Sequence, residues 1–335
     1  MERDVSSTNA DVPLYGSFLR VLKSELPHVK VRACKRFGKC LDCANIDEKI
    51  NKSDGLTREF WRAQKQHHNT WQMKERRKYY DHQVKSLDVD TRHRSLTLSI
   101  DNMDQSKSNL PSMRRPDKAL EKHLPLKVHI TGVMIHGMDR TEPMVFTWYD
   151  RFPASSNVIC TVLWETLSKL SENGTKSFPP VLNLHLDNCW RENKNKYVFG
   201  FLKALVTLGY FKKIKVGFKP VGHTHDLPDQ MFSVFSQAFA KHDIKSLADL
   251  HRLMTQCYTP HPECHHLDKM GAFNALLLPY LPAKGHIDGI TKPRCFKIMR
   301  SPSGKVVYKY RNQLQTEKKA HSQHTKHKNR SNQSS

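Results

Sequence analysis

Three aspartates stand where a run of apolar residues ends or a helical pattern begins. Asp101 follows the alternating run 95–100, Asp187 follows an apolar run from residue 181, and Asp229 begins a helical pattern. Carboxylates are the hard oxygen ligands that Mg²⁺ and Mn²⁺ prefer. Two such cations about 4 Å apart can activate a hydroxyl and stabilise the leaving oxygen of a phosphodiester. The three acids therefore predict a divalent-cation site, if the fold brings them together.

Four polar side chains accompany the aspartates in the sequence and could share in this chemistry: Asn188, His223, His225 and Asp226. Asn188 and His225 are predicted to orient water or the scissile phosphate. His223 and Asp226 are predicted to be further cation ligands. Because a His-x-His pair also occurs in transition-metal sites, a zinc-dependent hydrolase built on the two histidines is an alternative.

Each acid also has a purely structural interpretation. Asp187 could form an Asx turn that caps the following helix. Asp226 and Asp229 could be the N-cap and a first-turn acid of a helix, where negative charge is favourable without any cation. Asp101 could start a turn, with Asp104 as the ligand in its place. Acids at all three expected strand and helix ends of a basic chain favour the cation site.

A second set of candidate ligands lies near residue 40. Cys40 and Cys43 have the two-residue gap that lets a turn present both thiolates to one zinc ion. Cys34 and one of two adjacent histidines, His67 or His68, could complete a tetrahedral set. The alternative is a pair of reduced, partly buried thiols. The zinc ligands predicted are Cys34, Cys40, Cys43 and His68.

Hydrophobic periodicity indicates the elements that must position these groups. Strands are predicted at 95–100, 127–136, 144–149, 181–187, 214–218 and 304–310. Helices are predicted at 57–85, 155–170, 192–208, 229–241 and 245–256. The strand, helix and strand between residues 181 and 218 form a right-handed crossover of parallel strands, and ligands gather at the carboxyl ends of such strands.

The element order leads to a fold class. Three strands expected to be antiparallel, then helix, strand, helix, strand and helix, is the order of the ribonuclease H-like fold. We therefore predict an α/β protein with a mixed sheet flanked by helices and a small N-terminal cysteine-containing helical region. The predicted parts are a loose N-terminus at 1–28, a cysteine-containing basic helical region at 29–90, the ribonuclease H-like core at 91–257, a C-terminal extension at 258–312 and a disordered basic tail at 313–335.

The net charge of the chain indicates which class of partner it binds. Of 335 residues, 55 are Lys or Arg and 32 are Asp or Glu, which gives a formal net charge of +23. Such an excess favours a polyanionic partner, with nucleic acid, in particular DNA, ahead of a membrane. No membrane segment or secretion signal is expected, and eight scattered cysteines fit a reducing compartment. We expect a nuclear location and self-association of the chain.

Four stretches also carry a resemblance: RFGKCLDC, LSIDNMDQSKSNLP, KVHITGVMIHG and the long run LHLDNCWRENKNKYVFG through GHTHDLPDQMFSVFS. Over residues 29–240 the chain resembles a family of uncharacterised eukaryotic proteins whose shared region is a domain of unknown function. That family occurs in transposon-like copies and is similar to a ribonuclease H-like transposase or integrase core. The resemblance implicates Asp101, Asp187, Asn188, the run 192–195, His223, His225, Asp226 and Asp229.

Two hypotheses about function follow. The first is a transposable-element-derived, metal-dependent polynucleotidyl transferase or nuclease, in which the basic loop 107–122 binds the DNA backbone. Mg²⁺ or Mn²⁺ would be its cofactor, with structural Zn²⁺ at the cysteines. The second is a domesticated DNA-binding or protein-interaction module that keeps the fold without catalysis.

Overall fold

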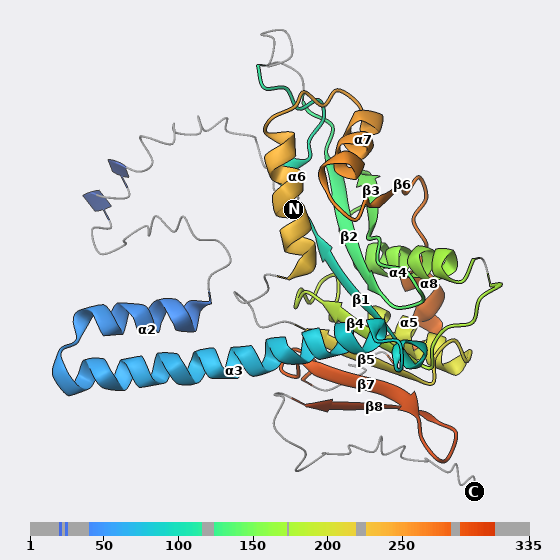
Figure 1. The fold of residues 1–335 in the computed structure, drawn as a ribbon, viewed down its shortest axis with the longest axis horizontal. Coiled ribbons are helices and arrows are strands. Elements are labelled where there is room, and N and C mark those ends of the chain that lie inside the picture. Colours follow the sequence, from blue (N-terminus) through green and yellow to red (C-terminus); the bar gives the residue numbers. More distant parts are fainter. Residues whose placement is uncertain are drawn as a thin grey trace, which may run out of the picture. The chain divides into compact units, whose positions relative to one another are not determined.

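The computed structural model describes residues 20–21, 24–25, 40–115, 124–172, 174–218, 226–282 and 289–311. The chain divides into two compact units, Met1–Phe37 and Gly38–Ser335. The helices and strands labelled in Figure 1 belong to the second unit. Three predicted site residues, Cys34, His223 and His225, lie outside the described residues.

One mixed sheet runs through the second unit, in the order β6-β3-β2-β1-β4-β5-β7-β8 (Figure 1). The strands are β1 (Ser95–Asn102), β2 (Val128–His136), β3 (Met144–Tyr149), β4 (Val181–Leu186), β5 (Lys213–Phe218), β6 (Glu263–His266), β7 (Cys295–Arg300) and β8 (Val306–Arg311). β1 pairs antiparallel with β2 and parallel with β4, and β4 pairs parallel with β5. Strand β1 therefore joins the antiparallel pair β2 and β3 to the parallel pair β4 and β5.

The five strands predicted before residue 220 are confirmed, as is the late strand that becomes β8. β6 and β7 were not predicted. β7 pairs antiparallel with β5, and β6 pairs parallel with β3. The segment 258–312, predicted as an extension, thus continues the central sheet. β6 has the sequence ECHH, whose polar residues give no strand signal, so only its pairing with β3 identifies it.

Helices cover both faces of the sheet (Figure 1). They are α2 (Leu41–Lys52), α3 (Gly55–Leu87), α4 (Ser156–Leu170), α5 (Lys196–Thr207), α6 (Leu227–Phe239), α7 (Leu247–Cys257) and the short α8 (Phe273–Leu277). Apolar residues of α4 and α5 pack on one face, and those of α6 and α7 pack on the other. Among the described helices, none combines the length and the hydrophobicity that crossing a membrane requires.

The two faces of β1 differ in chemistry. Leu96, Leu98 and Ile100 point into the apolar core under α4 and α5. The intervening residues Thr97 and Ser99 are also buried, on the opposite face. The two sets separate because successive side chains of a strand point to opposite faces of the sheet. The second face of β1 is therefore a buried polar surface.

The long helix α3 docks on this polar surface. Ser86 Oγ lies 2.8 Å from Thr97 Oγ1. On β4, His185 Nε2 lies 3.1 Å from His82 Nδ1 of the helix, and His185 Nδ1 lies 3.2 Å from Ser99 Oγ. The helix predicted at 57–85 is confirmed, and paired polar side chains take part in attaching its last turns to the sheet.

Candidate functional site

Asp101 and Asp187 lie side by side at the carboxyl ends of the central strands β1 and β4, and we call this end of the strands the acidic edge. The register of β1 and β4 sets Ile100 beside Leu186, so the two aspartates come next on strands about 4.8 Å apart. Both are half-buried and lie on the face that α3 and α6 cover, because the apolar residues before them point to the α4 and α5 side. Each carboxylate accepts a hydrogen bond from the next backbone amide, at 2.9 Å for Asp101 and 2.7 Å for Asp187. The structure brings these two predicted acids together.

The loop after β4 adds another acid, Glu192, at this edge. Asn102, the last residue of β1, donates from Nδ2 to Glu192 Oε2 at 2.8 Å and accepts at Oδ1 from Thr131 Oγ1 at 2.6 Å. Burial raises the pKa of Glu192, and the negative charge of Asp187 raises it further. Sequence reasoning gave Glu192 no role of its own. The signal was its place in the run 192–195 that the resemblance singled out.

A buried lysine fixes the same loop. Lys194 is 2% exposed, and its Nζ donates to Asn188 Oδ1 at 3.0 Å and to the Thr291 carbonyl at 2.8 Å. Burial lowers the pKa of Lys194 to about 8, and the charge of Arg294 also lowers it. Asn195 closes the loop, since its Oδ1 accepts from the first amides of α5. Asn188 is thus held in place beside Asp187, as a residue that orients a ligand would need to be.

Asp226 and Asp229 form a capping box at the start of α6. Asp229 Oδ2 accepts a hydrogen bond from Asp226 N at 3.0 Å. Burial lowers the pKa of His136 to about 4, and the negative charge of Asp226 acts in the opposite direction and raises it. His136 pairs with Thr97 in the β1–β2 register, whereas the partner of Asp101 lies four residues earlier in β2. The Asp229 carboxylate is therefore engaged with the helix start, while Met231 and Phe232, two and three residues later, lie against Gly132, the register partner of Asp101.

Three lysines stand side by side across β5, β7 and β8. The register pairs Lys215 with Lys297 and Lys297 with Lys309, so we call these three residues the lysine row. Lys297 and Lys309 are exposed and Lys215 is half-buried. The pKa of Lys215 is lowered to about 8 by burial and by the charges of Lys213, Lys297, Lys78 and Lys85. Like charges directly opposite each other destabilise a sheet, so the row favours an anion.

The basic loop predicted to bind DNA is described from residue 107 to 115. Ser112 exchanges backbone hydrogen bonds with Ile244, at 2.8 and 2.7 Å. Arg114 N donates to Asp243 Oδ1 at 2.8 Å. This part of the loop is therefore attached to the chain between α6 and α7. It lies near β2 and β3, whereas the lysine row is at the other end of the strand order.

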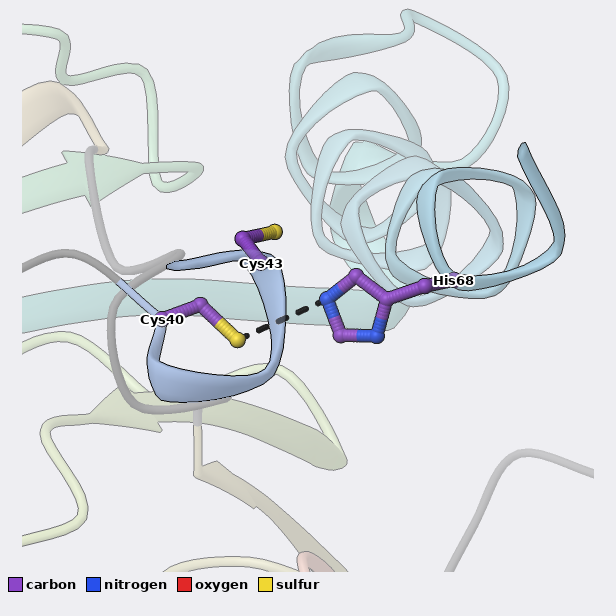
Figure 2. Close-up of side chains that lie close together, drawn as sticks. All are labelled: Cys40, Cys43 and His68. Carbon is purple, nitrogen blue, oxygen red and sulfur yellow. Dashed lines mark hydrogen bonds between the residues drawn. The ribbon is translucent and has the colours of Figure 1, made fainter. Parts of the chain in front are cut away.

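Cys40, Cys43 and His68 form a separate cluster on the α2–α3 hairpin (Figure 2). Their ligand atoms all lie within 4.8 Å of one another, and Cys40 Sγ is 3.5 Å from His68 Nε2. Cys40 is the N-cap of α2, Cys43 lies in its first turn and His68 lies in α3. The structure brings together three of the four predicted zinc ligands and selects His68 over His67. Within the described ranges this is the one such group of three or more metal-ligating side chains.

Comparison with known proteins places the chain in a family. Residues 118–316, more than half of the chain, match the domain of unknown function DUF7869. The match contains Asp187, Glu192 and the lysine row, while Asp101 and the Cys/His cluster precede it. A search of curated proteins finds none that matches. On the extent of the family match, the chain belongs to the DUF7869 family, a family of unknown function.

Proposed function

We propose that this protein is a divalent-metal-dependent enzyme that cleaves or transfers DNA strands, built on a ribonuclease H-like core of transposable-element origin. The observation that carries the proposal is the placement of Asp101 and Asp187 at adjacent carboxyl ends of β1 and β4. The partial order β3-β2-β1-β4-β5, with β1 antiparallel to β2 and parallel to β4, supports the core assignment.

Carboxylates at this edge are the ligand type that a hard cation takes, although among the described residues only the Cys/His cluster gathers three possible ligand atoms. Asp101 and Asp187 offer carboxylate oxygens from neighbouring strands, and Glu192 adds a third carboxylate beside Asp187. Oxygen ligands of this kind select Mg²⁺ or Mn²⁺. When bound, the cations would activate a water or a DNA 3′-hydroxyl and stabilise the leaving oxygen. Asn188, held by Lys194, would orient the water or the phosphate.

Glu192 takes the place in this proposal that sequence reasoning gave to Asp229. Glu192 already contacts the residue after Asp101 and interacts with Asp187. Asp229 bonds a backbone amide of its own helix. We therefore expect loss of the Asp229 carboxylate to act mainly on the stability of α6, and loss of Asp101, Asp187 or Glu192 to act on catalysis.

The lysine row supports DNA as the substrate. It lies on β5, the parallel neighbour of the strand that Asp187 follows, and on the two strands beyond. Lysines bind phosphates through charge without reading sequence, so the row suits the DNA backbone rather than a particular base sequence. A net charge of +23 acts in the same direction over the whole chain. A DNA substrate implies that the protein works in the nucleus.

The test is cleavage and strand transfer on labelled duplex and branched DNA, with Mg²⁺ or Mn²⁺ added to the full chain. The variants are Asp101→Asn, Asp187→Asn and Glu192→Gln, which preserve side-chain volume. Asp139→Asn is the matched control, because Asp139 is an exposed aspartate on the β2–β3 turn, paired with Arg92. We expect metal-dependent activity in the wild type and the control, and its loss in Asp101→Asn and Asp187→Asn.

The outcome also separates the enzyme from the alternative. Wild-type protein that binds DNA in a salt-dependent way, yet shows no metal-dependent chemistry on any of these substrates, would refute the enzyme and leave a DNA-binding module. Activity that zinc restores after chelation, when magnesium and manganese do not, would refute the carboxylate site.

A further inference from the structure

We infer that Cys40, Cys43 and His68 bind a structural Zn²⁺ that fastens α2 to α3. The spacing of their ligand atoms fits this ion. Zinc bonds of about 2.3 Å to sulfur and about 2.05 Å to nitrogen, set at tetrahedral angles, place the two ligand atoms about 3.6 Å apart. The observed distance from Cys40 Sγ to His68 Nε2 is 3.5 Å, and Cys43 Sγ completes a set within 4.8 Å (Figure 2).

The attachment of α2 supplies an independent reason for a metal. None of the 12 residues of α2 is buried, so the helix brings almost no apolar core to its contact with α3. The contacts that join the two helices include an ion pair of Lys65 with Asp47, and Lys49 Nζ at 3.9 Å from the centre of the Trp61 ring. Exposed ion pairs of this kind contribute little stability. Short elements without a core are commonly held by a metal or a disulfide.

The position of the cysteines also suits thiolate ligands. Cys40 is the N-cap of α2 and makes no side-chain hydrogen bond to the helix amides, so its sulfur is not used as a cap. Cys43 follows in the first turn. The two-residue gap between them is the spacing with which paired cysteines commonly bind one zinc ion. The buried Cys40 comes from the helix that has no core, and His68 comes from the middle of the helix that reaches the sheet.

A structural zinc takes four ligands, and three are assigned by geometry. The cluster shares no ligand with the acidic edge, since Asp101, Asp187 and Glu192 are not among its members, although Trp71 beside His68 packs against Arg294, whose charge acts on Lys194. The zinc proposal therefore does not rest on the proposed function, and each can fail without the other.

The experiment measures metal content and thiolate coordination in the full chain. Protein purified with zinc and dialysed is analysed for bound metal, and Co²⁺ is then substituted to read the sulfur-to-cobalt absorption. The variants are Cys43→Ser and His68→Asn. His67→Asn is the matched control, because His67 is the exposed neighbour on the same helix, and Cys257→Ser controls for loss of a thiol elsewhere.

We expect about one zinc per wild-type chain, and the same in both controls. Cys43→Ser and His68→Asn should lose the metal, and the cobalt absorption should fall in Cys43→Ser. Amide exchange measured in the wild type with and without chelator should accelerate at least about tenfold in α2 and stay unchanged in β1 and β4.

Two results would overturn the proposal. One is wild-type protein without stoichiometric zinc or cobalt after reconstitution. The other is full metal content in Cys43→Ser and His68→Asn. Because exchange in the wild type is measured with and without chelator, the conclusion stands even if a variant folds poorly.

Discussion

Removing the lysine row should weaken the salt dependence of DNA binding by a calculable amount. Adjacent strands are about 4.8 Å apart, so the backbones of the three residues span roughly 10 Å. Phosphates of one DNA strand recur about every 3.4 Å along the helix axis, so Lys215, Lys297 and Lys309 can reach about three of them. Each contact adds about 0.9 to the slope of log K against log salt. Replacing all three by Gln should therefore reduce the slope by about 2.7.

This slope sets the expected loss of affinity. Carried from 1 M to 0.1 M salt, a change of about 2.7 in slope corresponds to a loss on the order of several hundredfold. The assay is fluorescence anisotropy of a labelled duplex, titrated at salt concentrations between about 50 and 200 mM. A second triple variant, with Gln at Lys52, Lys176 and Lys269, removes the same charge from exposed positions outside both the lysine row and the basic loop. Equal slopes for the two triple variants would refute the lysine row as a DNA-binding surface.

Replacing Lys297 alone should stabilise the fold, although it weakens DNA binding. Lys297 stands directly between two other lysines, and like charges in direct cross-strand positions are destabilising. Lys297→Gln alone should therefore raise the free energy of unfolding, by about 0.2–1 kcal/mol, in the absence of DNA. Urea denaturation measures this change. A variant that loses both DNA affinity and stability would indicate a packing role for Lys297 instead.

Four further predictions concern stability. Asp229→Ala should lower the free energy of unfolding by about 0.5–2 kcal/mol in urea denaturation while metal-dependent activity persists, because the capping box is lost. The pKa of Lys215 is about 8 in the folded chain and ordinarily 10.5, so between these values the unfolded state binds more protons. The free energy of unfolding in urea should therefore rise with pH between about 8 and 10.5, and it should rise less in Lys215→Met. The pKa of His82 is lowered from 6.5 to about 3 by burial, so stability should fall as pH drops through that range, and thermal melts of His82→Gln should show a smaller fall. Gly137→Ala should cost more than about 1 kcal/mol in denaturation, because φ is +118° and a Cβ would lie 3.1 Å from the Ser95 carbonyl oxygen.

The acidic edge could be predicted because its determinants are local. Alternation identified β1, a short apolar run identified β4, and parallel strands put their carboxyl ends at one edge. Asp101 and Asp187 follow from those facts alone. Glu192 does not, because its contact with Asp187 depends on the path of a loop that Lys194 and Asn195 fix by hydrogen bonds.

Non-local pairing explains what the sequence did not predict. Lys215 was recognised as one polar residue of an alternating strand, but its neighbours Lys297 and Lys309 lie 82 and 94 residues later, on two strands of which one was not predicted. The docking of α3 was also hidden, because Ser86 and His82 are ordinary polar residues of a charged helix until Thr97 and His185 face them. Asp229 had two interpretations in the sequence, and only the backbone of α6 shows which hydrogen bond its carboxylate makes.

The folding unit of this protein extends further toward the N-terminus than its family match. The match begins at residue 118, after β1, yet β1 pairs with β2 on one side and β4 on the other. Without β1, the strands of the match would form two separate groups with open edges, which invite aggregation. The polar face of β1 in turn needs α3, whose Ser86 and His82 take part in its hydrogen-bond network. Helix α3 is therefore part of the structure that holds Asp101 beside Asp187, whereas a zinc ion at Cys40, Cys43 and His68 would act on the attachment of α2 to that helix.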